Sequence, residues 1–337
     1  MTRSILILVL ACLAPLAGAA ATVEAVDSVS INVSDLDRSI TFYRDVLGFR
    51  AISVREVSGE DYEHLIGVFG ARARIERMQL GDESINLVQY LAPQGRPRPA
   101  DSHANDRWFQ HVAIIVSDMD RAYGLLRDRH VAQASTGPQQ LPDWNSNAGG
   151  IRAYYFRDPD GNFLELLQFP PDKGDKRWQR RDGTLFLGID HTAIVVADTD
   201  ASLAYYRDHL GLRVAGHSEN HGIEQERLNN VFGARLRITA LRAAHGPGIE
   251  LLEYLAPQGG RPMPSDTRTN DDWCWLINLS MSDAAAAATE LRAARVPLVS
   301  GALVELHADD LGVRRAVLAR DPDGHVAMLG DSGASHE

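Results

Sequence analysis

Four stretches of the chain share one pattern of apolar and polar positions. Each begins with a run of β-branched and apolar residues, which is typical of a strand, and ends with a small residue and Asp, a favoured helix N-cap. The runs are residues 28–35, 111–118, 191–198 and 276–283. Each Asp is followed by a helical segment and then by strand-like stretches. The pattern therefore predicts a β-α-β-β-β unit that occurs four times.

The first and third of the predicted helices also carry an end signal. The four helices are expected at residues 36–47, 119–129, 203–210 and 284–294. Gly48 and Gly211 directly follow the first and third of them. Glycine is favoured after the last helical turn because it adopts the left-handed conformation without strain. We therefore expect both helices to end there.

Longer segments recur at a nearly constant spacing, which indicates a duplication. Residues 68–72 (Val-Phe-Gly-Ala-Arg) return at 231–235, and residues 157–161 (Arg-Asp-Pro-Asp-Gly) return at 320–324. We expect one half at 26–169, with modules 26–95 and 107–169, and a second half at 188–330, with modules 188–259 and 273–330. The segment 170–187 is rich in Pro, Gly and charge and is predicted to link the halves.

The overall charge limits the classes of partner. The 337 residues carry a formal net charge of −11, and no long basic run occurs. Nucleic acid and anionic membrane surfaces are therefore poor partners, and we expect an acidic, solvated surface.

The N-terminal residues have the composition of a targeting segment. Arg3 precedes a short apolar run, and small residues that include Ala19 and Ala21 follow it, as in a secretory signal peptide. The run is too short to span a bilayer comfortably. We expect a signal peptide at 1–21, cleaved after Ala19 or Ala21, and a periplasmic or secreted mature protein. Cys274, the remaining cysteine, is then expected to be a buried structural thiol.

Residues 157–167 combine a turn with an apolar strand that carries Glu165. A β-α-β-β-β unit with this turn, and with His opening a first strand, resembles the vicinal oxygen chelate superfamily. That superfamily includes glyoxalase I, bleomycin-resistance proteins, methylmalonyl-CoA epimerase and extradiol dioxygenases. The resemblance covers about residues 26–330. It implies an α+β fold in which four modules pair into two cupped antiparallel sheets.

The resemblance also implies the position of a metal, because each module contributes one first-strand and one fourth-strand residue to a cup. The second and third modules supply imidazoles and carboxylates, which suit a divalent cation: His111, Glu165, His191 and Glu250. The first and fourth modules supply weak or non-ligating groups: Ser28, Asn86, Leu276 and Met328. Taken singly, a histidine that opens a strand is more often a core residue than a ligand. Carboxylates in apolar strands, however, are costly to bury without a counter-charge.

Two pairings of the modules are possible. If neighbours pair, each cup holds one His and one Glu, and both sites are incomplete. If the second module pairs with the third, one cup holds all four ligands and the other holds none. This arrangement resembles the exchanged pairing of glyoxalase I. Because the ligands are lost together in two modules, we expect one metal cup between the halves and one degenerate cup.

The resemblance implies a Lewis-acid enzyme that binds one divalent ion, either Zn, Ni, Mn, Co or Fe. The ion would chelate vicinal oxygens of a small substrate and stabilise an enediolate, with Glu165 or Glu250 as the base. We expect a lyase, isomerase or epimerase, and export argues against a glutathione hemithioacetal as substrate. Arg235 and Arg237 could bind an anionic substrate, although an exposed outer strand face is slightly favoured for them.

Two alternatives stay open at this point. Two His and one carboxylate also form the triad of Fe(II) extradiol-type dioxygenases. A protein of bleomycin-resistance type would bind a small molecule in the cup without metal. Because the duplication supplies both halves of a cup, we expect a monomer or a homodimer.

Overall fold

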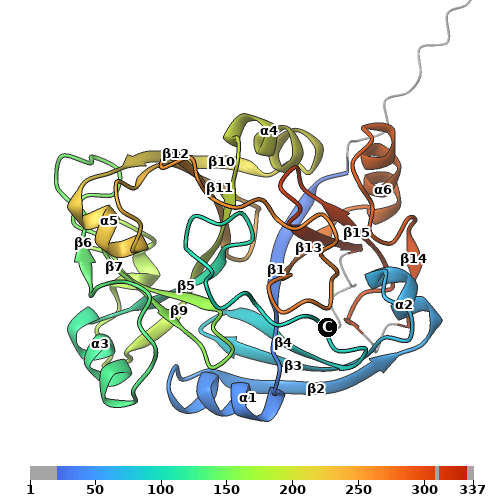
Figure 1. Cartoon of the computed structure of the whole chain (residues 1–337), viewed down its shortest axis with the longest axis horizontal. Helices are drawn as coiled ribbons and strands as arrows, with labels where there is room; N and C mark the ends of the chain where they lie inside the picture. Colours follow the sequence, from blue (N-terminus) through green and yellow to red (C-terminus); the bar gives the residue numbers. More distant parts are fainter. Residues whose placement is uncertain (1–20, 308–310, 332–337) are drawn as a thin grey trace, which may run out of the picture.

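The computed structural model describes residues 21–307 and 311–331. Two curled eight-stranded sheets lie side by side, with helices packed against them (Figure 1). Residues 1–20 of the predicted signal peptide lie outside the described residues. The predicted α+β architecture of four modules in two sheets is confirmed.

The first sheet, here called sheet A, combines the first and fourth modules. Its strand order is β14-β15-β16-β13-β1-β4-β3-β2. The strands are β1 (Val23–Asn32), β2 (Arg50–Ser58), β3 (Arg72–Leu80), β4 (Glu83–Ala92), β13 (Leu276–Met281), β14 (Val304–Glu305), β15 (Arg315–Arg320) and β16 (Val326–Asp331). The two modules join where β1 pairs antiparallel with β13.

The second sheet, here called sheet B, combines the second and third modules. Its strand order is β10-β11-β12-β9-β5-β8-β7-β6. The strands are β5 (Gln110–Val116), β6 (Gln139–Gln140), β7 (Arg152–Arg157), β8 (Phe163–Gln168), β9 (Phe186–Val196), β10 (Arg213–Asn220), β11 (Arg235–Arg242) and β12 (Gly248–Ala256). Here β5 pairs antiparallel with β9. The exchanged pairing of modules is therefore the one that the chain adopts.

The expectation of purely antiparallel sheets was wrong, because both sheets are mixed. Within each module the first and last strands pair in parallel, as β1 does with β4 and β5 does with β8. The crossover helix returns the chain to the starting end of the module, and two hairpins follow. The last strand therefore runs in the same direction as the first.

The predicted helices lie close to their expected positions. They are α1 (Leu36–Asp45), α3 (Met119–Asp128), α4 (Thr199–Leu203) continued by the π-helical turn η2 (Ala204–His209), and α6 (Ala284–Ala293). The predicted Asp caps the start of each: the side chain of Asp35, for example, accepts a hydrogen bond from the backbone N–H of Arg38. Gly48 and Gly211 have positive φ angles of 75° and 76°, as their positions after a helix predict.

Three short helical segments were not predicted. They are α2 (Glu60–Ile66), α5 (Ile223–Asn229) and the 3-10 turn η1 (Lys176–Gln179). Both α2 and α5 begin after a glycine with positive φ and without a side-chain cap, so the usual N-cap signal is missing. The turn η1 lies in the predicted linker, where the buried ring of Trp178 fixes it to the protein core.

The hydrophobic core joins modules that the sheets keep apart. Residues of the first and second modules share one cluster, in which Tyr43 of α1 and Tyr154 of β7 are fully buried. The third and fourth modules share an equivalent cluster around Tyr206. Sheet pairing thus connects the first module with the fourth, and helix packing connects it with the second. This double connection makes the four modules one body.

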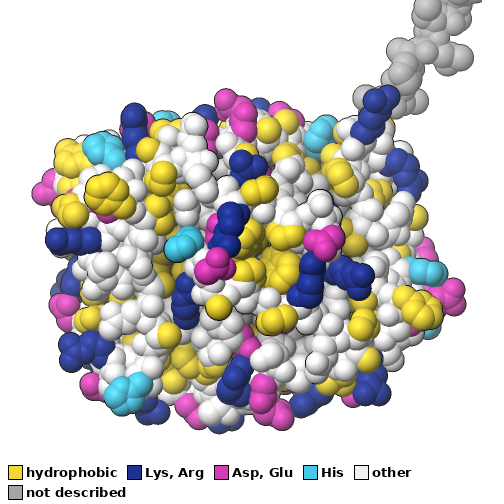
Figure 2. Space-filling view, in the orientation of Figure 1, with side chains coloured by type: hydrophobic (Ala, Val, Ile, Leu, Met, Phe, Trp, Pro, Cys, Tyr) yellow, Lys and Arg dark blue, Asp and Glu magenta, His cyan; other side chains and the backbone are white. Residues whose placement is uncertain are grey.

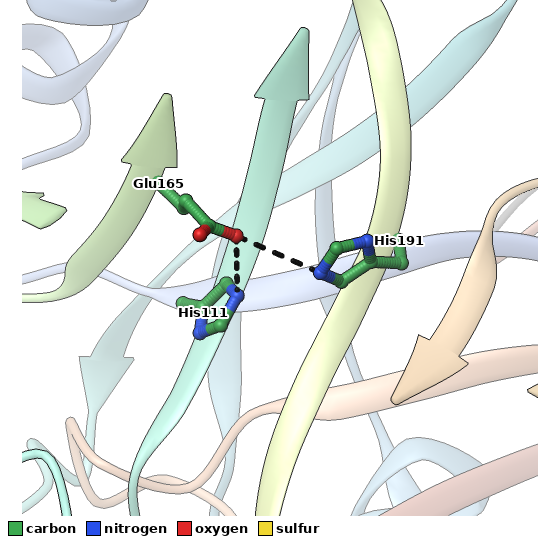
Figure 3. Close-up of side chains that lie close together, drawn as sticks. All are labelled: His111, Glu165 and His191. Carbon is green, nitrogen blue, oxygen red and sulfur yellow. Dashed lines mark ion pairs between the residues drawn. The ribbon is translucent and has the colours of Figure 1, made fainter. Parts of the chain in front are cut away.

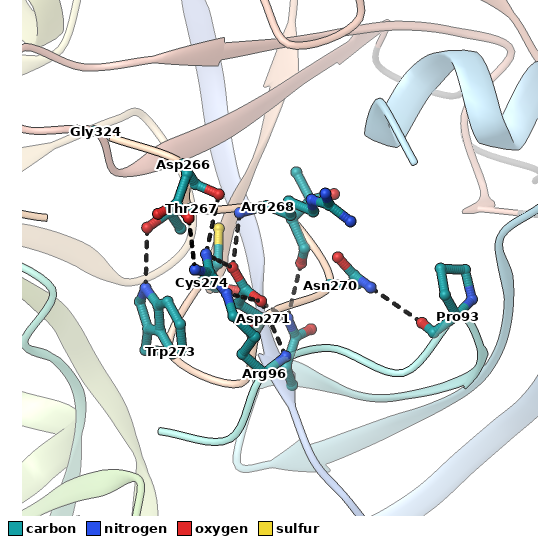
Figure 4. A network of polar contacts seen from close by, with 12 residues as sticks. Pro93, Arg96, Asp266, Thr267, Arg268, Asn270, Asp271, Trp273, Cys274 and Gly324 are labelled. Atoms are coloured by element: carbon teal, nitrogen blue, oxygen red, sulfur yellow. Dashed lines mark hydrogen bonds and ion pairs between the residues drawn. The ribbon is translucent and has the colours of Figure 1, made fainter. Parts of the chain in front are cut away.

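The linkers between modules fix the exchanged arrangement by matched ion pairs. A guanidinium nitrogen of Arg96 lies 2.7 Å from a carboxylate oxygen of the buried Asp271, and the guanidinium also lies over the ring of Trp273 (Figure 4). In the other linker, Arg261 contacts Asp106 at 2.7 Å. Each pair ties a segment of one half to a segment of the other. Trp273 is packed as a core residue.

Acidic and basic side chains alternate over the face shown in Figure 2, and no single-sign patch dominates it. None of the helices in the described part of the chain is long and apolar enough to cross a membrane. Cys274 is buried and free, as predicted.

Candidate metal centre

Strand alternation places the four predicted ligands on the concave face of sheet B. Val112 and Ile114 point into the core beneath the helices, so His111 and Ala113, one position away, face the cup. Glu165 has the same relation to Leu164 and Leu166. The apolar neighbours that made this carboxylate unusual in the sequence belong to the opposite face of its strand.

Three of these side chains converge. Oε2 of Glu165 lies 3.1 Å from Nε2 of His111 and 3.6 Å from Nε2 of His191, so the carboxylate lies between the two imidazoles (Figure 3). Ligand atoms of all three lie within 4.8 Å of one another, and all three residues are buried. The ligands come from β5, β8 and β9, and their separation along the chain is bridged by the pairing of the two halves.

Glu250 completes the group from the other side. Its Oε2 lies 3.4 Å from Nε2 of His191, and its side chain is 24% exposed, against 6% for Glu165. Glu250 is therefore the carboxylate with freedom to move, whereas Glu165 is enclosed. The structure thus brings three of the four predicted ligands into one cluster, and Glu250 lies beside that cluster in contact with His191.

A second layer of charge orients His191. Nδ1 of His191 lies 3.0 Å from Oδ2 of Asp190, which is itself held by the guanidinium of Arg242 at 2.9 Å. This contact directs Nε2 toward the other ligands. Burial alone would lower the pKa of His191, but the charges of Glu250 and Asp190 outweigh it and raise that pKa to about 9. The site thus carries an excess of negative charge that a cation would balance.

The residues present fit a divalent cation. Within the described part of the chain, neither ring nitrogen of the buried His111 has a hydrogen-bond partner, although Nε2 lies near Glu165. A buried polar atom without a partner destabilises a protein unless a ligand satisfies it. Two imidazoles and two carboxylates form a donor set that suits Zn, Ni, Mn, Co or Fe.

The cavity at this centre is small. Its volume is about 110 Å³, and the segment 141–151 contributes to its wall. We call this segment the strap. Asn145 in the strap donates from Nδ2 to Oδ1 of Asn220 at 2.7 Å, and Trp144 stacks on His221 with ring centroids 4.3 Å apart. The strap was not predicted, because nothing in its sequence distinguishes it from a loop.

Arg235 and Arg237 lie on the outer face of their strand, which is the interpretation that the sequence slightly favoured over substrate binding. Arg235 and Arg237 are not brought to the cavity, since Leu236 and Ile238, at the alternate positions of β11, line it. Both arginines instead contact carboxylates on the outer face, those of Glu219 and Asp200 respectively.

His325, which follows the repeated Asp-Pro-Asp-Gly turn at 321–324, lies in the protein interior. It is buried, and its Nε2 lies 2.9 Å from the carbonyl oxygen of Val195. Asn162, at the equivalent position 163 residues earlier, donates to the carbonyl of Asn32 in the same way. The ring of His325 thus replaces an amide that joins two modules. The repeat could have indicated this role, because Asn and His can both donate to a carbonyl.

The sequence profile of the glyoxalase, bleomycin resistance protein and dioxygenase superfamily matches residues 25–166 and 188–329. The chain belongs to this superfamily. The two matched segments are the two halves of the duplication, so the superfamily covers nearly all of the described residues.

Curated relatives of the superfamily include different enzymes. The chain is 32% identical over 151 residues to a 2-epi-5-epi-valiolone epimerase from Actinomyces sp., an alignment that covers 43% of this chain and 80% of the epimerase. It is 24% identical over 186 residues to a lactoylglutathione lyase from Arabidopsis thaliana, covering 55% of this chain and 54% of the lyase. The chain thus spans about half of the length of that lyase. These relatives make an enzyme plausible without defining a reaction.

Solved structures of the superfamily share the complete architecture. Glyoxalase I from Zea mays superposes with a TM-score of 0.57 over 93% of this chain and 92% of its own, at 14% identity. A putative dioxygenase from Bacillus subtilis superposes with a TM-score of 0.55 over 93% of this chain and 86% of its own, also at 14% identity. At such identity the likeness concerns the fold alone.

Proposed function

We propose that this protein is a metal-dependent enzyme of glyoxalase type, a lyase, isomerase or epimerase that moves a proton on a small substrate with vicinal oxygens. The observation that carries the proposal is the convergence of His111, Glu165 and His191 at the junction of the two halves. Relatives named as an epimerase and as a lactoylglutathione lyase support this reaction class.

The residues of the centre divide into a holding group and a reacting group. We assign His111, Glu165 and His191 to hold the cation, because they are buried and close to one another. The cation, when bound, would polarise the two adjacent oxygens of the substrate and make the neighbouring C–H bond more acidic. Glu250 is the proposed base, because it is partly exposed and contacts only one of the imidazoles among these ligands.

The small volume of the cavity restricts the substrate. A volume of about 110 Å³ accommodates only a molecule of a few heavy atoms, well below the usual size of ligand pockets. Its wall beyond the ligands is mainly apolar, with Leu236, Ile238 and Leu252 among the lining residues. We therefore propose a small α-hydroxycarbonyl compound as the substrate, unless the strap moves to admit a longer one.

An exchange experiment with a simple α-hydroxyketone tests the reaction class. The protein loaded with Zn, Ni, Mn, Co or Fe would be incubated in D2O with hydroxyacetone, and C–H exchange followed by proton NMR. We expect metal-dependent exchange at the carbon that carries the hydroxyl group, and none with the Glu250→Gln protein. Exchange that is unaffected by a chelator would contradict the proposal.

A dioxygenase is the second candidate, because the close triad consists of two His and one carboxylate. This set is the facial triad of non-haem Fe(II) enzymes that activate oxygen. Oxygen uptake by the Fe(II)-loaded protein in the presence of a catechol would favour it over proton transfer. A purified protein that binds small molecules but never a metal would instead favour a non-catalytic binding protein.

We also propose that the protein is exported to the periplasm or secreted, with cleavage after Ala19. The sequence before Ala21 supports the signal peptide, and the side chain of Ala21 is buried in the core cluster around Tyr206. Cleavage after Ala21 would remove this contact, whereas cleavage after Ala19 keeps it. The intact mass of the mature protein, recovered from the periplasm or medium, tests both points.

A further inference from the structure

A second and larger cavity lies in sheet A, away from the candidate metal centre. Its volume is about 1220 Å³, against about 110 Å³ beside the metal ligands. Such a volume exceeds that of most pockets for small ligands. The cup without the predicted metal ligands is therefore the more spacious of the two.

The floor of this cavity has become a closed polar network. Ser28 occupies the position of His191 in the repeat, and its hydroxyl oxygen accepts hydrogen bonds from the side-chain amides of Asn86 at 3.1 Å and Asn278 at 3.0 Å. Ser28 in turn donates to Asp27 at 2.7 Å. Ser28, Asn86 and Asn278 are neutral and satisfy one another, and the neighbouring carboxylate of Asp27 is paired with Arg77.

Arginines have replaced small or apolar residues around the same cavity. Arg55, Arg77 and Arg314 line it, and the residues 163 positions away that correspond to them in sheet B are Ser218, Ala240 and Ile151. Arg77 is half of a bidentate pair with Asp27, at 2.8 and 3.1 Å. Two further carboxylates on the wall, Glu305 and Asp331, lie near Arg315. Sheet A thus has Arg55 and Arg314 where sheet B has Ser218 and Ile151, whereas the pair of Arg77 and Asp27 has a counterpart in Arg242 and Asp190 beside the metal ligands.

The remaining wall is apolar and aromatic. Tyr62, Leu65 and Ile66 of α2 line one part, while Leu276 and Met328 stand where the other cup has His111 and Glu165. A ligand that matches both parts has a negatively charged head and an apolar body, since guanidinium groups bind carboxylate and phosphate oxygens in pairs.

We propose that the cavity of sheet A is a second binding site, independent of metal, for an amphipathic organic anion with a carboxylate or phosphate head. Its cationic side chains act on the head of the ligand, and α2 together with Leu276 and Met328 packs against the body. The site is separate from the metal centre in its residues and in its chemistry.

Fluorescence titration of the full-length protein with 8-anilinonaphthalene-1-sulfonate tests this proposal. We expect saturable binding of one probe per chain, unchanged after treatment with a chelator. Displacement by decanoate or decyl phosphate, but not by decanol, would establish the need for a charged head, and the stronger of the two competitors would identify the head group.

Variants assign the binding to this cavity. The double variant Arg55→Gln and Arg314→Gln should weaken probe binding by about tenfold, because it removes two guanidinium groups from the wall. Arg72→Gln is the matched control: Arg72 lies on the same sheet, is exposed, and does not line the cavity. A Leu276→Trp variant should also weaken binding, by filling the space. The proposal would be overturned if the probe did not bind, or if a chelator abolished its binding. It would also be overturned if decanol displaced the probe equally well, or if the double variant bound it as tightly as the wild type.

Discussion

His111 and His191 face each other across the antiparallel pair formed by β5 and β9, with ring centroids 5.7 Å apart. One histidine belongs to the first half of the duplication and the other to the second. The register of β5 on β9 pairs His111 with Ala193 and Ala113 with His191, which places both imidazoles on the concave face. The candidate centre therefore depends on the pairing of halves, and neither half contains it alone.

The two carboxylates should have separable roles. Glu165→Gln should weaken metal binding, because Glu165 lies between both imidazoles, whereas Glu250→Gln should retain the metal and lose proton transfer. The loss of rate should be at least about a hundredfold, as for removal of a general base. Metal content and hydroxyacetone exchange, measured on both proteins, check this. Normal exchange in Glu250→Gln would exclude that residue as the base.

Asp190 should strengthen metal binding through His191. Replacing it with Asn weakens the contact that directs Nε2 and removes the negative charge paired with Arg242, so metal affinity should fall by roughly 10- to 100-fold. Competition with a chromogenic chelator measures this. The matched control is Asp27→Asn, the equivalent position in sheet A. If both variants, or neither, lose metal affinity, the orienting role of Asp190 is wrong.

The strap should be held closed by Asn145. Asn145→Ala removes the hydrogen bonds that Nδ2 donates to Asn220 and Glu219, and the one that Oδ1 accepts from the N–H of Ala148. Backbone amides of residues 141–151 should therefore exchange with solvent faster, by at least about tenfold. Hydrogen–deuterium exchange with mass spectrometry follows this segment. Gln139→Ala is the control, since its side-chain amide donates to the carbonyl of Gly137 and both residues lie outside the strap. Unchanged exchange in Asn145→Ala would show that other contacts close the strap.

Asp158 should make stability depend on pH. This carboxyl is fully buried at the junction of the first two modules, and burial raises its pKa to about 6, from a usual value of 3.8. Between about pH 4 and pH 6 the unfolded chain ionises this group while the folded protein keeps it protonated. Stability from this group is therefore present below pH 4 and declines as the pH rises through 6, by up to about 3 kcal/mol.

Asp158→Asn should remove this contribution and flatten the dependence of the free energy of unfolding on pH in that window. Urea denaturation at pH 4, 5, 6 and 7 measures the slope. Part of the pH dependence should remain in this variant, because the pKa of Asp272 is also raised to about 6. The surface variant Asp120→Asn serves as control, because a hydrogen bond to Arg152 lowers the pKa of Asp120. An identical slope in Asp158→Asn and wild type would contradict the assignment.

Sequence reasoning reached the fold because the same local signals occur four times. Asp35, Asp118, Asp198 and Asp283 all cap the helices that they were expected to cap. The exchanged pairing was predicted from chemistry, because at the expected ligand positions of the strands only the second and third modules carry His and Glu. Strand direction was not predicted correctly, because the alternation of apolar residues is the same in parallel and antiparallel strands.

Other features depend on contacts between distant segments and leave no local signal. Asp190 was not singled out, since an Asp before a strand histidine is unremarkable until Arg242 is seen beside it. The strap and the large cavity of sheet A were likewise not anticipated. The arginines of that cavity could have been noticed by comparing the repeats, because the positions of Arg55 and Arg77 are occupied by Ser218 and Ala240 in the second half.

The metal content of the purified protein tests the central claim most directly. Mass spectrometry of the elements in the wild-type protein should give about one equivalent of a divalent metal per chain. Ser28→Ala should give the same value, whereas His191→Ala, the equivalent change in the other sheet, should give little. A wild-type protein that binds no metal when offered Zn, Ni, Mn, Co and Fe, or a His191→Ala protein with a full equivalent, would contradict the account.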